Sequence, residues 1–171
     1  CGDGGSGNTT VGVAKFNIAS LPTNIATATL NLNIGNHGGS IPSSAKIYLI
    51  NPNKCTDVTG VGQLINNIGT VYGNSYTGTT GANNAYNYFG IAESQSLGEI
   101  WQNQTGAKTF DVTAAVETAR TNGWNELCLA FIMPKTYGNN GSPDWSDIHI
   151  GTNATVTYTY YNYPITNTTI S

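Results

Sequence analysis

Residues 109–134 read TFDVTAAVETARTNGWNELCLAFIMP and combine the clearest helical pattern of the chain with its most apolar strand. Asp111 is a good helix N-cap, because its carboxylate can accept hydrogen bonds from the free amides of the first turn. Small apolar residues then recur at helical spacing, and Asn122-Gly123 supplies a left-handed stop. After Trp124 the apolar residues alternate, so the sequence predicts one short helix that leads into a core strand.

Strand patterns dominate the rest of the chain. Alternating apolar residues indicate half-buried antiparallel strands over residues 11–18, 26–34, 45–50 and 154–161. The mixed segment 61–91 suggests two more strands, over residues 64–72 and 85–91, around a flexible loop. Polar loops are expected at residues 35–44 and 135–147, and the sheet breaks at INPNKC. We therefore predict an all-β fold, a jelly-roll-like antiparallel β-sandwich with one short helix.

Composition restricts the function. The 171 residues fit a single domain, and only 9% of them are charged, against about 25% in typical proteins. The net charge is −3 and the six basic residues are scattered, so neither nucleic acid nor an anionic membrane is an expected partner. No apolar run has the length of a transmembrane segment. A surface of Asn, Thr, Ser, Gly and Tyr is typical of extracellular or cell-surface proteins.

The chain divides into three parts. Residues 1–10 form a Gly-rich head, a linker or donor segment, residues 11–161 the β-sandwich domain, and residues 162–171 a polar, strand-prone tail. Cys1 before a Gly/Ser tether matches a processed lipoprotein, and it also suits an intermolecular link or an ordinary cysteine. Residues 2–7 match G-x-G-x-x-G, but no strand precedes them and no helix follows, so nucleotide binding is not expected.

Several motifs resemble one known family. The segments VAKFNIASLPTNIATATLNLNI, FDVTAAVETA and ATVTYTYY, with a Trp101 segment between the first two, are similar to the DNRLRE or disaggregatase-related β-sandwich family. The resemblance extends over residues 11–161 and implies a secreted or surface module that binds glycans or has a structural role. The family has an extra N-terminal strand where this chain has only its head, and this chain adds a tail.

Two cysteines lie inside the predicted domain. Cys55 follows the third strand, and Cys128 points away from the main core face of the apolar strand. A disulfide between them would stabilise the fold by about 4 kcal/mol in the chain-entropy model. The alternative is a pair of buried free thiols. No metal site or cofactor is predicted, since His37 and His149 lie in unrelated segments.

Two kinds of sequence feature, N-glycosylation sequons and exposed aromatic residues, point to glycans. Five N-glycosylation sequons begin at Asn8, Asn103, Asn140, Asn153 and Asn167. An exposed aromatic residue could also stack on a bound sugar. Trp101 and Trp124 flank predicted core elements, which leaves Trp145, in a polar loop, as the preferred stacking residue, ahead of the Tyr86 and Tyr88 pair.

Catalysis is not expected. The acids Glu93, Glu99, Asp144 and Asp147 lack a surrounding glycosidase or calcium-binding motif, and no nucleophile elbow or P-loop occurs. Two non-enzymatic hypotheses remain. One is a structural subunit of an extracellular filament that joins copies of itself by strand donation, and the other is a secreted carbohydrate-binding module or adhesin.

The filament hypothesis rests on the missing family strand. A sandwich that lacks a strand exposes both an edge and part of its core, and a segment of the next subunit could cover them. Either the head or the tail could donate that segment. We favour the head, because the missing strand lies on that side and its glycines let a backbone cross between subunits.

Overall fold

The computed structural model is centred on strand β8 (Glu126–Ile132), which lies in a layer of five antiparallel strands. β8 pairs with β2 (Thr9–Asn17) on one edge and with β4 (Ser44–Ile50) on the other. β5 (Tyr72–Tyr76) extends this layer beyond β2, and β6 (Gly98–Trp101) extends it beyond β4. The structure describes residues 2–3, 9–39, 44–56, 72–76, 81–135, 146–151 and 153–162.

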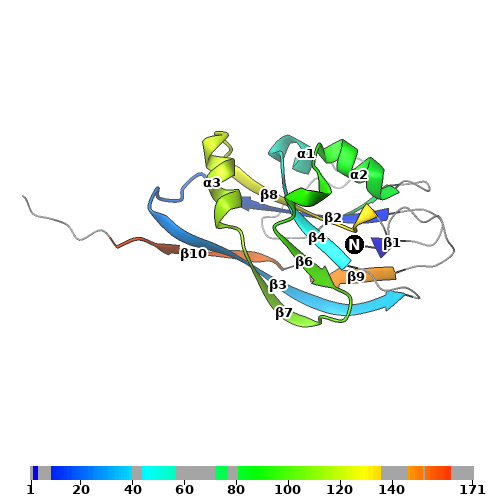
Figure 1. Ribbon diagram of the computed structural model, residues 1–171. Coiled ribbons are helices and arrows are strands. Elements are labelled where there is room, and N and C mark those ends of the chain that lie inside the picture. The colour runs from blue at the N-terminus through cyan, green and yellow to red at the C-terminus, as the bar shows by residue number, and fades with distance from the viewer. Residues whose placement is uncertain are drawn as a thin grey trace, which may run out of the picture.

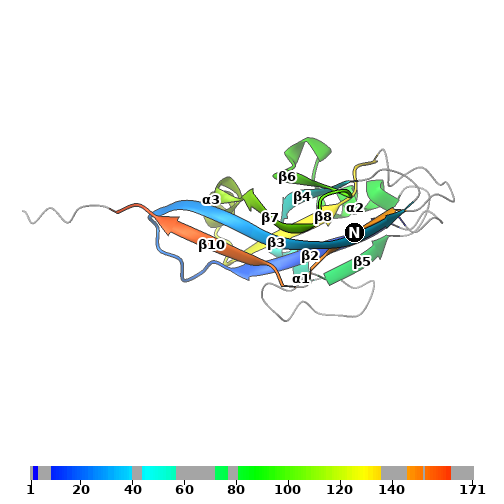
Figure 2. The same cartoon turned by 90° about the horizontal axis from the view of Figure 1, so that it is seen from below.

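A second layer is built on the long strand β3 (Ile25–Gly39). One edge of β3 pairs with β7 (Gly106–Asp111), and the other pairs with β10 (Thr155–Tyr160) and then with β9 (Ser146–Ile150). The short strand β1 (Gly2–Asp3) pairs with both β2 and β9 and so links the two layers. Figures 1 and 2 show this arrangement from two sides. The predicted antiparallel β-sandwich is therefore confirmed.

Apolar side chains form two cores. The larger core lies between the two layers and includes Phe16, Leu30 and Phe131, and α3 (Thr113–Thr121) packs against it through Val116. The second core lies on the outer face of the β2–β8–β4 layer. There α1 (Pro52–Thr56) and α2 (Gly81–Phe89) cover the strands (Figure 1). Every residue of β8 after Glu126 is buried, because both faces of the layer are covered.

Helix α2 corrects the prediction of a strand over residues 85–91. Ala85, Tyr86 and Phe89 are buried in the second core at helical spacing. The Tyr86 hydroxyl bonds to the Tyr48 hydroxyl at 2.9 Å and donates to the Met133 carbonyl at 3.2 Å. Tertiary contacts thus select the helix in a segment whose local pattern was ambiguous.

Other boundaries also differ from the prediction. A short helix, α1, replaces the expected irregular break, and β9 begins inside the expected loop at residues 135–147. A 3₁₀ turn (Glu93–Gln95) separates α2 from β6. The predicted strand at residues 64–72 lies outside the described residues except for Tyr72, which begins β5. The described part of the chain holds three α-helices where one was predicted.

The start of α3 lies one residue later than expected. Val112 is the N-cap and contributes no side-chain bond, while Asp111 is the last residue of β7. The Asp111 carboxylate still accepts hydrogen bonds from the Thr113 amide at 2.9 Å and from its hydroxyl at 2.6 Å. These bonds lower the pKa of Asp111. Gly123, with φ of +70°, ends the helix as predicted.

Candidate functional site

Strand β10 lies at one edge of the β3 layer, and none of its residues is fully buried. Ala154 is buried before the strand begins, and half-buried Val156 and Tyr158 pack against the larger core. Tyr160 follows a shift in register and has an exposed fraction of 41%. Thr155, Thr157 and Thr159 point to the other face and are exposed. Within the described residues, β10 pairs with β3 alone. The strand therefore has an open edge beside an apolar face that is only partly buried. We define Val156, Tyr158 and Tyr160 as the β10 edge.

The backbone direction of β10 follows from the bonds of β3. Ala28 directs its amide to the Thr113 hydroxyl and its carbonyl to the Val112 amide, on the side of β3 away from β10. The backbone N–H and C=O groups of the next residue, Thr29, therefore face its β10 partner Thr157. By the same alternation, the amides of Val156 and Tyr158 face away from β3. These are the groups that an added strand would engage.

The head and the β10 edge lie at opposite ends of the sandwich (Figure 1). β1 pairs with the first two residues of β9, which pair in turn with Gly38 and Gly39 at the end of β3. Tyr160 pairs instead with Ile25, the first residue of β3. Because β3 has 15 residues, about 45 Å separates the two ends. The first and last described strands thus mark two different ends of the molecule.

The two predicted disulfide partners lie close together in the second core. Cys55 on α1 and Cys128 on β8 are both buried, and both are free thiols in this structure. A hydrogen bond to Cys55, together with burial, raises the pKa of the Cys128 thiol. The two cysteine side chains are therefore neighbours, as predicted, but no disulfide bond joins them in this structure. The disulfide itself stays a prediction.

The other predicted site residues are scattered. Asn103, in the turn between β6 and β7, and Asn153, before β10, are exposed, which suits glycosylation at either position. Outside the described residues lie Cys1, Asn8, Asn140, Asp144, Trp145 and Asn167. Tyr86 is buried and cannot serve as a stacking platform, whereas Trp101 is 41% exposed at the end of β6.

Two of the candidate acids, Glu93 and Glu99, have partners within the fold. Glu93 forms an ion pair with Lys46 at 3.3 Å, and Glu99 accepts a hydrogen bond from Ser44. Among the described residues, no three His, Cys, Asp or Glu side chains gather as metal ligands. No helix in the described part of the chain is long and apolar enough to cross a membrane.

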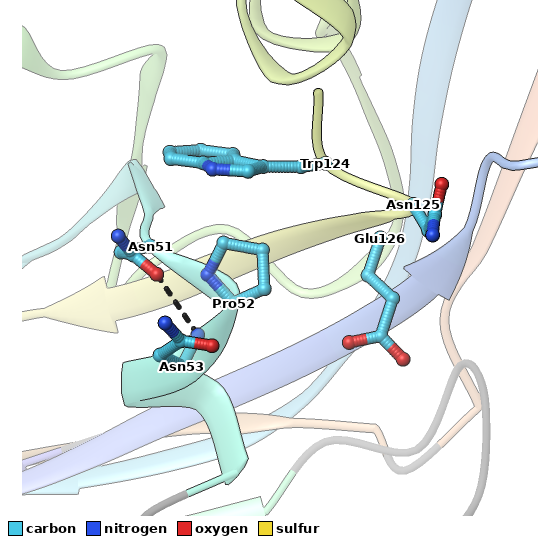
Figure 3. Close-up of a pocket in the computed structure, with 6 residues that line it drawn as sticks. All are labelled: Asn51, Pro52, Asn53, Trp124, Asn125 and Glu126. Carbon is cyan, nitrogen blue, oxygen red and sulfur yellow. Dashed lines mark hydrogen bonds between the residues drawn. The ribbon is translucent and has the colours of Figure 1, made fainter. Parts of the chain in front are cut away.

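A pocket that the sequence analysis did not identify lies between the end of β4 and the start of β8. Its volume is about 360 Å³. The lining consists of Asn51, Pro52, Asn53, Trp124, Asn125 and Glu126 (Figure 3). The two lining segments are more than 70 positions apart in sequence and meet because Ile50 pairs with Cys128. The sequence signal for this pocket is a pair of short, Asn-containing turns, one after β4 and one before β8. Only the register of those strands brings the turns together.

Comparisons with protein-family models, curated proteins and solved structures find no match for this chain.

Proposed function

We propose that this chain is the repeating subunit of an extracellular filament, joined by strands that one copy donates to the next. One observation carries the proposal: the head and the β10 edge lie at opposite ends of the sandwich (Figure 1). A contact between the head of one copy and the β10 edge of the next joins two different surfaces. Such a heterologous contact repeats without closing when its rotation does not close a ring, and it then builds a filament.

A donated strand would satisfy the β10 edge in two ways. Its backbone would bond to the outward amides and carbonyls of Val156 and Tyr158. Its side chains would cover the half-buried face that ends at Tyr160. The backbone hydrogen bonds and the apolar burial both favour association, because unpaired strand edges and exposed apolar faces tend to bind other chains.

The head suits the donor role better than a fully integrated strand would. Among the described residues, β1 consists of Gly2 and Asp3, which pair with two residues of β2 and two of β9. Few bonds must therefore break before the head extends toward a neighbour. β2, which follows the head, pairs with β8 from Gly12 to Asn17 and with β5 from Thr9 to Val13, so it would remain in place.

The test uses proline on the β10 edge. In Val156→Pro the lost amide faces away from β3, so the subunit should keep its fold while a donated strand loses its bonding position. Filament formation, followed by negative-stain electron microscopy and light scattering, should fall strongly. Thr157→Pro is the matched control, because its amide faces β3 and its loss should destabilise the subunit itself.

Deletion of residues 1–8 tests the donor without altering β2. The truncated protein should stay monomeric, and adding a synthetic peptide of the head should raise its melting temperature. Filaments from the truncated protein, or an intact protein that stays monomeric at high concentration, would refute strand donation by the head.

A further inference from the structure

We propose that the pocket between Asn51 and Trp124 binds one ring of a neutral oligosaccharide. Figure 3 shows the indole of Trp124 on one side of the pocket, with one face toward Pro52 and Asn51, while Asn53 and Glu126 lie on the other side. The volume of about 360 Å³ is at the lower end of the range for small-molecule pockets. The C–H face of a pyranose packs well on an indole face, which carries the negative side of the ring quadrupole.

The polar groups of the pocket match the hydroxyls of a sugar. The Asn51 side-chain oxygen accepts the Asn53 amide at 2.9 Å, which fixes the orientation of the Asn51 carboxamide. Within the described residues, neither the Asn51 NH₂ group nor the Asn125 carboxamide has a protein partner. Each carboxamide carries donors and an acceptor, the combination that a hydroxyl group needs.

The charge of the pocket favours a neutral ligand. Glu126 is its one charged lining residue, and Lys15 neutralises that carboxylate at 3.2 Å. No lysine or arginine lines the pocket to attract a phosphate, sulfate or sugar acid. A cationic ligand would have to compete with Lys15 for Glu126.

The pocket is held in place before any ligand arrives. Gly123 has φ of +70° and turns the chain so that the Trp124 amide bonds to the Ala119 carbonyl at 2.9 Å. The opposite wall is fixed by the pairing of β4 with β8, which ends at Ile50 and Cys128. A preformed site loses little conformational entropy on binding. Trp124 also packs against the larger core. A purely structural role would explain its ring but not the carboxamides of Asn51 and Asn125 around it.

The test uses the full chain with Trp101→Phe and Trp145→Phe, so that fluorescence reports Trp124 alone. The probes are mannotetraose, cellotetraose, N-acetylchitotetraose and, as an anionic control, trigalacturonate. At least one neutral tetrasaccharide should shift the emission of Trp124 with millimolar affinity, and trigalacturonate should not. Asn51→Ala and Asn125→Ala should each weaken binding about tenfold, as expected for one lost hydrogen bond to ligand.

Two controls separate binding from stability. Trp124→Leu keeps an apolar group on the core and should abolish binding measured by calorimetry, while Asn103→Ala, at an exposed turn far along the chain, should leave affinity unchanged. No response to any neutral probe, a response to trigalacturonate alone, or unchanged affinity in Trp124→Leu would overturn the proposal. The site does not depend on strand donation, so the Val156→Pro protein should bind the same probe with the same affinity.

Discussion

The β8 layer and the β10 edge use the same antiparallel pairing but differ in what covers them. β8 is buried from Leu127 to Ile132, between the larger core and the helices α1 and α2. β10 has exposed threonines on one face and half-buried Val156 and Tyr158 on the other. Helices α1 and α2 thus cover the outer face of the β8 layer, whereas within the described residues β10 pairs with β3 alone. The proposed strand donation depends on this difference in burial and pairing.

The largest expected effect contrasts the two regions directly. Phe131→Ala removes a fully buried ring from β8 and should lower the free energy of unfolding by about 3–5 kcal/mol, because it leaves a cavity in the larger core. Thr157→Ala on the exposed face of β10 should change it by no more than about 0.5 kcal/mol. Urea unfolding of the monomeric truncated protein measures both values. Similar losses in the two variants would contradict the difference in burial.

The predicted disulfide partners both lie on the covered side of the β8 layer. Oxidation of Cys55 and Cys128 by a disulfide donor such as oxidised glutathione should raise the free energy of unfolding by about 4 kcal/mol. Non-reduced peptide mapping should show the two peptides linked in secreted material. The reduced native protein should react slowly with iodoacetamide, because burial and the bond to Cys55 raise the pKa of Cys128. Rapid alkylation of both thiols in native material would count against the pair.

The tyrosine pair beneath α2 predicts an alkaline limit on stability. Burial raises the pKa of Tyr48 to about 12 and raises that of Tyr86 as well. Because these pKa values are raised, the two neutral hydroxyls contribute fully to the free energy of unfolding below the ordinary tyrosine pKa of about 10. Their contribution declines as the pH rises from there. The urea midpoint should therefore fall between about pH 10 and 12. Tyr48→Phe should cost about 1 kcal/mol at neutral pH and reduce the alkaline decline.

Asp111 gives a small predicted effect, because its side chain is exposed at the end of β7. Asp111→Ala removes two hydrogen bonds to Thr113 and should cost about 0.5–1 kcal/mol at neutral pH. The pKa of Asp111 is lowered in the folded protein. The carboxylate therefore contributes to the free energy of unfolding above the ordinary aspartate pKa, and this contribution declines as the pH falls through the pKa of the folded protein. Asp111→Asn keeps an acceptor and should lose less. A melting temperature unchanged in Asp111→Ala would exclude a role for these bonds.

The sequence by itself determined the elements with strong local patterns. Alternation defined β2, much of β3, β4 and β10, and the spacing of small apolar residues defined α3 with its stop at Gly123. The alternation of Leu127, Leu129 and Phe131 after Trp124 indicated the core strand β8. Each of these signals lies within a dozen residues, because side-chain periodicity follows directly from local backbone geometry.

The tertiary structure decided what depends on distant contacts. Residues 81–89 form a helix because Tyr86 and Phe89 are buried in the second core and Tyr86 bonds across it to Tyr48. The Trp124 pocket exists because strand register places Asn51 beside Trp124, and no local pattern encodes that register. The single pairing of β10 among the described residues likewise follows from how the strands are assembled, not from its own sequence. Burial is a property of the assembled layers, so the same alternating pattern produced a covered strand in one layer and an exposed edge in the other.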